Sequence, residues 1–239
     1  MTGKQRIGKL VIKISPVSPE VMTILRTEFR AFRNRVNYRL NPFKRMKVKK
    51  FTSSDNISLN IGCGPFGQDG WVNVDLMNLR NVSFTFDSRR RLPFKDQTVK
   101  RIRVEHFFEH LDKEFEVPFF LEECKRVMKQ GAVLRIAVPD IEKFILAYSQ
   151  NNKNLWVSLG YDLNALPEGF DTKIAILNYI FRQNGEHKYA YDYEGLNYLL
   201  NQHGFKNITK QNFQESLDDQ LKADLENHSN HSLYVDCIK

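Results

Sequence analysis

Four side chains that can bind a metal ion or move a proton lie within the short segment EHFFEHL, residues 105–111. His106, Glu109 and His110 form the pattern H-x-x-E-H, the inverted form of a zinc-hydrolase motif. On a helix, the two histidines would share a face as metal ligands, and Glu109 would lie beside a metal-bound water. Such a site also needs a third protein ligand, and here the motif directly follows a strand-like run. We therefore expect no metal site.

The same histidines are candidates for proton transfer, because the pKa of histidine lies near neutrality. His106 is the first candidate for a catalytic base, followed by His187 in the segment GEHKYAYD, and then by His110. For each of them, the alternative is a structural histidine whose ring nitrogens are satisfied by hydrogen bonds.

Residues 58–76, SLNIGCGPFGQDGWVNVDL, place several glycines between two apolar runs and end near an acid, Asp75. Gly62, Gly64 and Gly67 match the dinucleotide-binding pattern G-x-G-x-x-G. A dinucleotide site also needs a helix that starts at the third glycine and an acid roughly 20 residues further on. Asp75 follows Gly64 by only 11 residues, which leaves too little chain for a helix that holds a pyrophosphate.

A cofactor without phosphates, such as S-adenosylmethionine, fits this stretch better. It needs glycines that let the backbone approach closely, and an acid at the end of the second strand that accepts both ribose hydroxyls. The stretch supplies both. The alternative is a glycine-rich connection between two strands with a solvated Asp75.

The order of the later segments strengthens the cofactor hypothesis. After Asp87 come LPF, EHFFEH, RVMKQG and HKYAYD. With the glycine stretch and WVNVD, this order resembles the class I S-adenosylmethionine-dependent methyltransferases, in particular the methyltransferase type 11-like branch. The resemblance covers residues 57 to about 210 and touches the C-terminal strand.

Position by position, the resemblance implies how S-adenosylmethionine would bind. Gly62, Cys63 and Gly64 would line its methionine portion, and Asp75 would hold its ribose. Ala132 stands where the family usually has a glycine, and the basic run 89–91 is unusual. That run could orient an anionic substrate or be plain solvated charge. The resemblance also implies that Leu76 would flank the adenine and that Asp87 would hydrogen-bond its amino group. The floor near the methyl group would be formed by Glu105 and His106.

Strand-like and helix-like patterns alternate after residue 56, which is typical of an α/β protein. The resemblance makes this a three-layer αβα Rossmann-like methyltransferase fold with a seven-stranded, mostly parallel sheet in the order 3-2-1-4-5-7-6. Gly131 is expected to close the helix at 113–130. Strands are predicted at 57–61, 71–76, 82–86, 99–104, 132–140, 206–211 and 231–239, and further helices at 141–150 and 194–205.

We divide the chain into a basic N-terminal arm, residues 1–50, and a methyltransferase domain, residues 51–239, with an insertion at about 151–190. The arm holds 14 Lys or Arg against Glu20 and Glu28, about +12, so the other 22 basic and 26 acidic residues give about −4. It reads as a short strand at 8–15 and an amphipathic helix that Pro42 ends. The helix could pack its apolar stripe on the body, or dock on RNA, an anionic lipid or an acidic protein. The stripe comprises Val21, Leu25, Phe29, Phe32, Val36 and Leu40.

The overall composition is that of a globular protein. Three widely spaced cysteines and no apolar signal segment suggest a reducing cytoplasm. No apolar run approaches the roughly 20 residues that span a bilayer, so we expect at most peripheral membrane association.

We expect O-methylation of a sugar or another small-molecule acceptor, with the insertion as a lid over it. The insertion's aromatic side chains could wall the acceptor pocket or form a small auxiliary core. An RNA methyltransferase that uses the basic arm, and a non-catalytic methyltransferase-like binding module, are the alternatives. These aromatic residues are Trp156, Tyr161, Phe170, Tyr179 and Phe181.

Overall fold

The computed structural model describes residues 17–166 and 168–239. Its seven strands form one sheet in the order β3-β2-β1-β4-β5-β7-β6, which is the predicted order. Neighbouring strands are parallel from β3 to β5, and β7 runs antiparallel to both of its neighbours. The predicted strand at 8–15 lies outside the described residues.

The strands are β1 (Ile57–Ile61), β2 (Val72–Asp75), β3 (Phe84–Thr85), β4 (Val99–Glu105), β5 (Met128–Pro139), β6 (Lys206–Gln211) and β7 (Ser232–Ile238). The α-helices are α2 (Pro19–Leu40), α3 (Pro42–Thr52), α4 (Glu116–Val127), α5 (Ile141–Ser149), α6 (Lys153–Ser158), α7 (Lys173–Arg182) and α8 (Tyr193–Gln202). Short 3-10 turns are η1 (Phe108–His110), η2 (Gln183–Gly185), η3 (Asp219–Leu221) and η4 (Glu226–His228).

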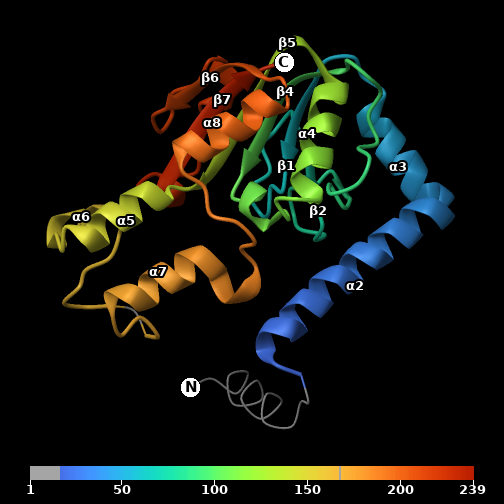
Figure 1. The fold of residues 1–239 in the computed structure, drawn as a ribbon. Helices are drawn as coiled ribbons and strands as arrows, with labels where there is room; N and C mark the ends of the chain where they lie inside the picture. The colour runs from blue at the N-terminus through green and yellow to red at the C-terminus, as the bar shows by residue number, and fades with distance from the viewer. Residues whose placement is uncertain (1–16, 167) are drawn as a thin grey trace.

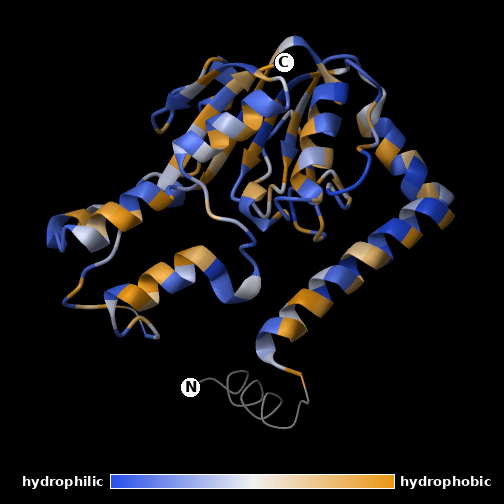
Figure 2. Ribbon diagram, viewed as in Figure 1, coloured by the Kyte–Doolittle hydropathy of each residue, from blue (hydrophilic) through white to orange (hydrophobic). Residues whose placement is uncertain are grey.

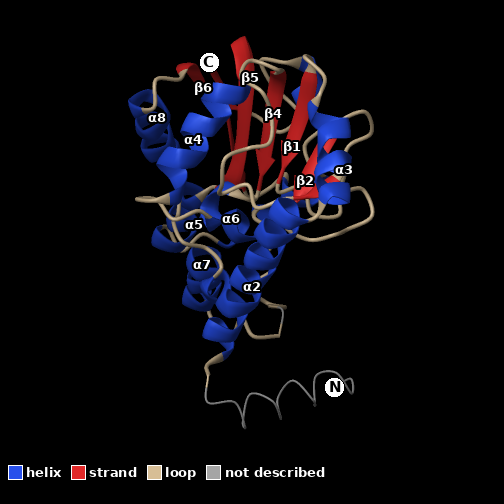
Figure 3. Cartoon of the chain, turned by 90° about the vertical axis from the view of Figure 1, so that its right-hand side faces the viewer, coloured by secondary structure: helices blue, strands red, loops and turns tan. Residues whose placement is uncertain are grey.

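Helices cover both faces of the sheet: α4 and α8 lie on one face, and α3 lies on the other (Figure 3). The main core consists of apolar side chains from the central strands and these helices, such as Leu59, Ile102 and Leu134, all fully buried. The remaining helices extend beyond the edge of the sheet where β1, β4 and β5 end (Figure 1).

The prediction that Gly131 closes a helix was wrong. Helix α4 ends at Val127, and β5 begins at the next residue because Met128 pairs with Val99 of β4. Gly131 lies inside this strand with φ of +76°. Residues 128–130, which helical periodicity had assigned to the helix, therefore belong to β5.

The N-terminal arm forms two helices that share one residue as a cap. Ser18 caps the start of α2, and Asn41 ends it ahead of Pro42. The Asn41 side chain then accepts hydrogen bonds from the backbone of Phe43 and Lys44 and so starts α3.

The apolar stripe of α2 does not pack on the body. Its six side chains are all exposed, from 37% for Val36 to 76% for Leu40. The buried side of α2 is instead the face around Ala31, which is fully buried. Figure 2 shows the apolar residues alternating with hydrophilic ones along the helix.

The insertion forms a second, smaller core with α5. Trp156, Ile176 and Phe144 are fully buried in it. Four of the five insertion aromatics that sequence reasoning singled out join this cluster, while Phe181 is 36% exposed. The auxiliary-core alternative therefore describes these four: Trp156, Tyr161, Phe170 and Tyr179.

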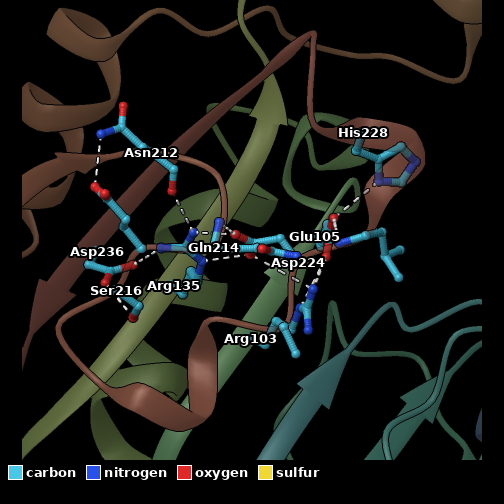
Figure 4. A network of polar contacts seen from close by, with 12 residues as sticks. Arg103, Glu105, Arg135, Asn212, Gln214, Ser216, Asp224, His228 and Asp236 are labelled. Carbon is cyan, nitrogen blue, oxygen red and sulfur yellow. Dashed lines mark hydrogen bonds and ion pairs between the residues drawn. The ribbon is translucent and has the colours of Figure 1, made fainter.

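A buried ion network ties the segment between β6 and β7 to the sheet (Figure 4). The guanidinium of Arg135 donates to both carboxylate oxygens of Asp224, at 2.8 and 2.6 Å, and to Asp236 at 2.8 Å. All three side chains are at most 1% exposed. Because buried charges are tolerated only when paired, these contacts fix the position of the whole segment.

We expect Arg135→Met to lower the free energy of unfolding by about 3–5 kcal/mol, because it leaves two carboxylates buried without their cation. Chemical denaturation monitored by circular dichroism measures the change. Lys222→Met is the control, since Lys222 forms only a surface pair with Asp219 and its loss should leave the midpoint unchanged. Equal stability of the two variants would show that the network contributes nothing.

Candidate active site

A cavity of about 440 Å³ opens at the edge of the sheet where β1, β2 and β4 end. Residues of α2 close one side of it, and Gly185, Glu186 and Lys188 at the end of the insertion close another. Seven residues that the sequence suggested as site residues line it: Gly62, Gly64, Asp75, Leu76, Asp87, His106 and His110.

Asp75 is held in place by backbone amides on both sides. Its Oδ2 accepts a hydrogen bond from Gly64 N at 2.8 Å, and its Oδ1 accepts one from Met77 N at 2.7 Å. The carboxylate closes β2 and is 9% exposed, at the cavity wall. Each oxygen keeps a lone pair that can accept a hydroxyl of a ligand.

Gly62 and Gly64 both have left-handed backbones, with φ of +68° and +52°. A Cβ on Gly62 would lie 2.6 Å from the Cβ of Phe107, so no other residue fits there. A Cβ on Gly64 would meet no atom within 4 Å, because this backbone borders the cavity. The connection to β2 contains only turns, as the short distance to Asp75 predicted.

Asp87 is engaged by Arg89, whose Nε lies 2.9 Å from Asp87 Oδ1 and whose Nη2 lies 3.2 Å from Oδ2. Arg89 also pairs with Glu28 of α2 at 2.5 Å. Because Arg89 contacts both Asp87 and Glu28, it joins the arm to the body, and its side chain is only 11% exposed. Arg90 and Arg91, the other two members of the basic run, are exposed.

Glu105 and Cys63 do not line the cavity. Glu105 belongs to the ion network: it contacts Arg103, and its Oε1 accepts from Leu225 N at 3.1 Å (Figure 4). Burial alone would raise the pKa of Glu105, but His228 and Arg103 outweigh it and lower the pKa to about 2. Burial and the charge of Asp75 raise the pKa of the Cys63 thiol to about 12, so it is not a thiolate at neutral pH.

His106 follows β4 with φ of +50°, a left-handed conformation that costs about 1–3 kcal/mol for a residue other than glycine. Its ring is fixed from both sides. Nε2 lies 2.8 Å from Ser232 Oγ, and Nδ1 lies 3.2 Å from Oε1 of Glu109.

Two further histidines stack beside His106. The ring centroid of His228 lies 3.9 Å from that of His106, and His231 lies 5.7 Å away. Neither was identified as a site residue from the sequence. The only sequence signal for them is that they are two of the six histidines in the chain. Burial is the largest cause that lowers the pKa of His231, and together with the neighbouring His106, His228 and Lys143 it brings the pKa to about 4.

His110 and His187 also lie beside Glu109. Their ring centroids are 5.0 Å apart, and His187 Nε2 lies 4.0 Å from Glu109 Oε1. Burial lowers the pKa of His187, which therefore favours its neutral form. The structure thus brings all three candidate histidines around one carboxylate, although only His106 and His110 line the cavity.

No family model matches the chain, and no curated protein does. Solved structures do resemble it. A methyltransferase from Archaeoglobus fulgidus, described as dependent on S-adenosylmethionine (SAM), is 17% identical (91% of this chain, 99% of that one; TM-score 0.43). A possible histamine N-methyltransferase from Thermotoga maritima is 14% identical (88% and 98%; TM-score 0.47).

A third is the 1,6-didemethyltoxoflavin-N1-methyltransferase of Burkholderia thailandensis, with S-adenosylhomocysteine bound, 12% identical over 94% of this chain and 92% of that one, with a TM-score of 0.46.

We expect the free energy of unfolding to fall as the pH drops from about 6.5 toward 4, by about 1–2 kcal/mol from His231 alone. The pKa of His231 is lower in the folded chain, so the unfolded chain binds the extra proton in this window and unfolding is favoured. The partly exposed ring keeps the effect below the full shift. Denaturation of wild type and His231→Gln at several pH values measures it, and an identical pH dependence in both would contradict the assignment.

Proposed function

We propose that the protein transfers the methyl group of S-adenosylmethionine to an oxygen atom of a sugar or another small-molecule acceptor. One observation carries this proposal: the Asp75 carboxylate, fixed by the amide of Gly64, lines the same cavity as His106 and His110. A ribose-binding acid and candidate bases thus face one enclosed space.

In the proposed complex, Asp75 accepts the ribose hydroxyls, and the backbone at Gly62, Cys63 and Gly64 borders the methionine portion. Leu76 flanks the adenine. Asp87 accepts from the adenine amino group with the lone pairs that Arg89 leaves free. Glu105 supports the floor below the methyl group indirectly, through its contact with His228.

When bound, the cofactor supplies an electrophilic methyl group, so the protein has to position the acceptor and remove its proton. His106 is the proposed base because its ring lines the cavity. With the proton on Nδ1, beside Glu109, Nε2 keeps the lone pair that would take the acceptor's proton in place of its contact with Ser232. A base held by a carboxylate in this way keeps a defined tautomer and stabilises its protonated form. His110 and His187 each contact a backbone carbonyl through Nδ1, which points to a role other than that of the base.

The cavity wall from α2 and the insertion favours a small acceptor. Glu28 and Glu186 lie on this wall together with Arg30 and Lys188, so polar groups of both signs surround the space. Such a mixture suits the hydroxyl groups of a sugar.

We expect Asp75→Ala to weaken binding of S-adenosylhomocysteine by about 10- to 100-fold, because the carboxylate's hydrogen bonds to the ribose are lost. Isothermal titration calorimetry measures the affinity. Asp75→Asn removes the carboxylate's charge but keeps an oxygen that can accept from Gly64 N. Asp55→Ala, which removes an exposed acid before β1, is the matched control. Wild-type protein that binds no S-adenosylhomocysteine would support a non-catalytic module, and unchanged affinity in Asp75→Ala would refute the proposed site.

A further inference from the structure

We propose that Glu109, His110 and His187 form a binding site for one divalent transition-metal ion. One potential ligand atom from each residue lies within 4.8 Å of the other two. The site borders the cavity through His110. Its members come from η1 and from the end of the insertion, and the main chain joins them, since Glu109 O accepts from Lys188 N at 2.9 Å.

The first argument is the state of the Glu109 side chain. It is fully buried, and neither carboxylate oxygen has a hydrogen-bond partner of good geometry among the described residues. The nearest polar side-chain atom is His106 Nδ1, 3.2 Å from Oε1, and it leaves Oε2 without a contact. A buried carboxylate with so few contacts is costly, and a bound cation would remove that cost.

The second argument is the orientation of the two imidazoles. His110 Nδ1 lies 3.0 Å from the carbonyl oxygen of Glu186, and His187 Nδ1 lies 2.6 Å from that of Ile180. A carbonyl only accepts, so in both rings Nδ1 carries the proton and Nε2 keeps its lone pair. Metal-binding histidines are usually held in this way, with the second ring nitrogen donating to a backbone carbonyl or a carboxylate.

The ligand set decides which ions fit. Two neutral imidazoles and one carboxylate suit Zn²⁺, Co²⁺, Mn²⁺ or Fe²⁺, whereas Mg²⁺ and Ca²⁺ prefer oxygen ligands alone. Three protein ligands leave a coordination position open. If the proposed methyl transfer holds, that position would bind the acceptor's oxygen; binding of the ion itself does not depend on that function.

The proposed ligands differ from those that the H-x-x-E-H pattern suggests, which are His106 and His110 on one helix face. Residues 108–110 form a 3-10 turn, so His106 and His110 do not share a helix face. His106 is turned toward Ser232 instead. The third ligand that the sequence lacked comes from His187, 77 positions after His110.

The test uses the full-length, untagged protein after treatment with a chelator and titration with Zn²⁺ and Co²⁺. We expect one ion per chain, with a visible absorption band for bound Co²⁺. Glu109→Gln and His187→Gln should each weaken binding by at least about tenfold. His203→Gln, at the end of α8, is the matched control and should bind as wild type does.

Three outcomes would overturn the proposal: no stoichiometric binding by wild type, unchanged affinity in Glu109→Gln and His187→Gln, or equal loss in His203→Gln. Thermal unfolding of the metal-free proteins checks that the variants fold. Glu109→Gln should be at least as stable as wild type, because it removes a buried charge. S-adenosylhomocysteine affinity of the wild-type protein, measured on the same preparation, reports on the proposed function alone, so failure of the metal site and failure of the proposed function give different results.

A different observation, the exposed stripe of α2, carries a second inference: the structure assigns the outward face of α2 and α3 to an anionic membrane surface. Phe29, Phe32 and Leu40 are 66%, 57% and 76% exposed, and Phe43 at the start of α3 is 79% exposed. So many large, exposed apolar side chains along two consecutive helices are unusual on a protein surface that faces only water.

The positive charge of α2 and α3 favours an anionic partner. Residues 17–50 contain ten Lys or Arg and only two acids, Glu20 and Glu28. Both acids pair with arginines of the body, Arg182 and Arg89. Arginines thus neutralise both acids, and the positive charge that remains on α2 and α3 suits an amphipathic helix lying in the headgroup region of an anionic bilayer.

A second cavity, of about 680 Å³, lies between α2, α3, β3 and the segment after β2, and could receive an anionic headgroup. Its cationic lining residues are Arg30, Arg33, Lys44 and Lys47. Among residues 17–166 and 168–239, no helix has the length and apolar composition to cross a bilayer, so the contact would lie in the membrane surface. Two copies of so basic a face would repel one another. RNA bases could stack on the phenylalanines, but RNA has no use for exposed aliphatic side chains such as Leu40.

Sedimentation with vesicles tests this inference. We expect the protein to bind vesicles of phosphatidylcholine mixed with phosphatidylglycerol, to bind pure phosphatidylcholine vesicles weakly, and to lose affinity as salt rises. The double variant Phe29→Ser/Phe32→Ser should lose most of the binding. Tyr198→Ser, at an equally exposed aromatic residue on α8, should retain it.

Equal binding by the two variants, or no binding by wild type, would overturn the membrane assignment. A dimer in light scattering that Phe29→Ser/Phe32→Ser dissociates would replace the membrane with a second copy of the chain. RNA binding that is unaffected by the double variant, together with no vesicle binding, would assign the face to nucleic acid.

Discussion

The paired charge of Arg135 is the constraint from which much of the site geometry follows. Its guanidinium is buried at the middle of β5 and can be tolerated there only with both aspartates in contact. Asp236 belongs to the neighbouring strand, but Asp224 comes from the segment between β6 and β7. Satisfying the arginine therefore draws that segment over the sheet edge where β4 and β5 end.

That placement has consequences for the candidate active site. Leu225 N and His228 both contact Glu105, the last residue of β4. His228 then stacks on the ring of His106, and Ser232 contacts its Nε2. A network with no direct access to the cavity thus fixes the ring of the candidate base in one orientation, and a substitution in the network would affect function through that orientation.

Features that depend on local sequence patterns were predicted from the sequence, whereas contacts between residues far apart in the chain were not. The spacing from Gly64 to Asp75 leaves no room for a helix, and the strand runs and their resemblance gave the sheet order. Periodicity identified the stripe of α2 but could not say whether anything covers it. It also extended α4 too far, because pairing of Met128 with Val99 overrides helical propensity. The environment of Glu105 depends on His228, 123 positions away, and no local pattern contains such information.

The segment 106–110 departs from local rules twice within a few residues. His106 has a left-handed backbone, and Glu109 is a buried carboxylate without hydrogen bonds of good geometry. Neither feature is required to connect β4 with α4, and the surrounding contacts must compensate for both. Such costs concentrate where a structure is shaped for a ligand. Because the Glu109 carbonyl also holds the end of the insertion, its carboxylate can serve a ligand while its main chain serves the fold. A change of the side chain alone therefore separates the two roles.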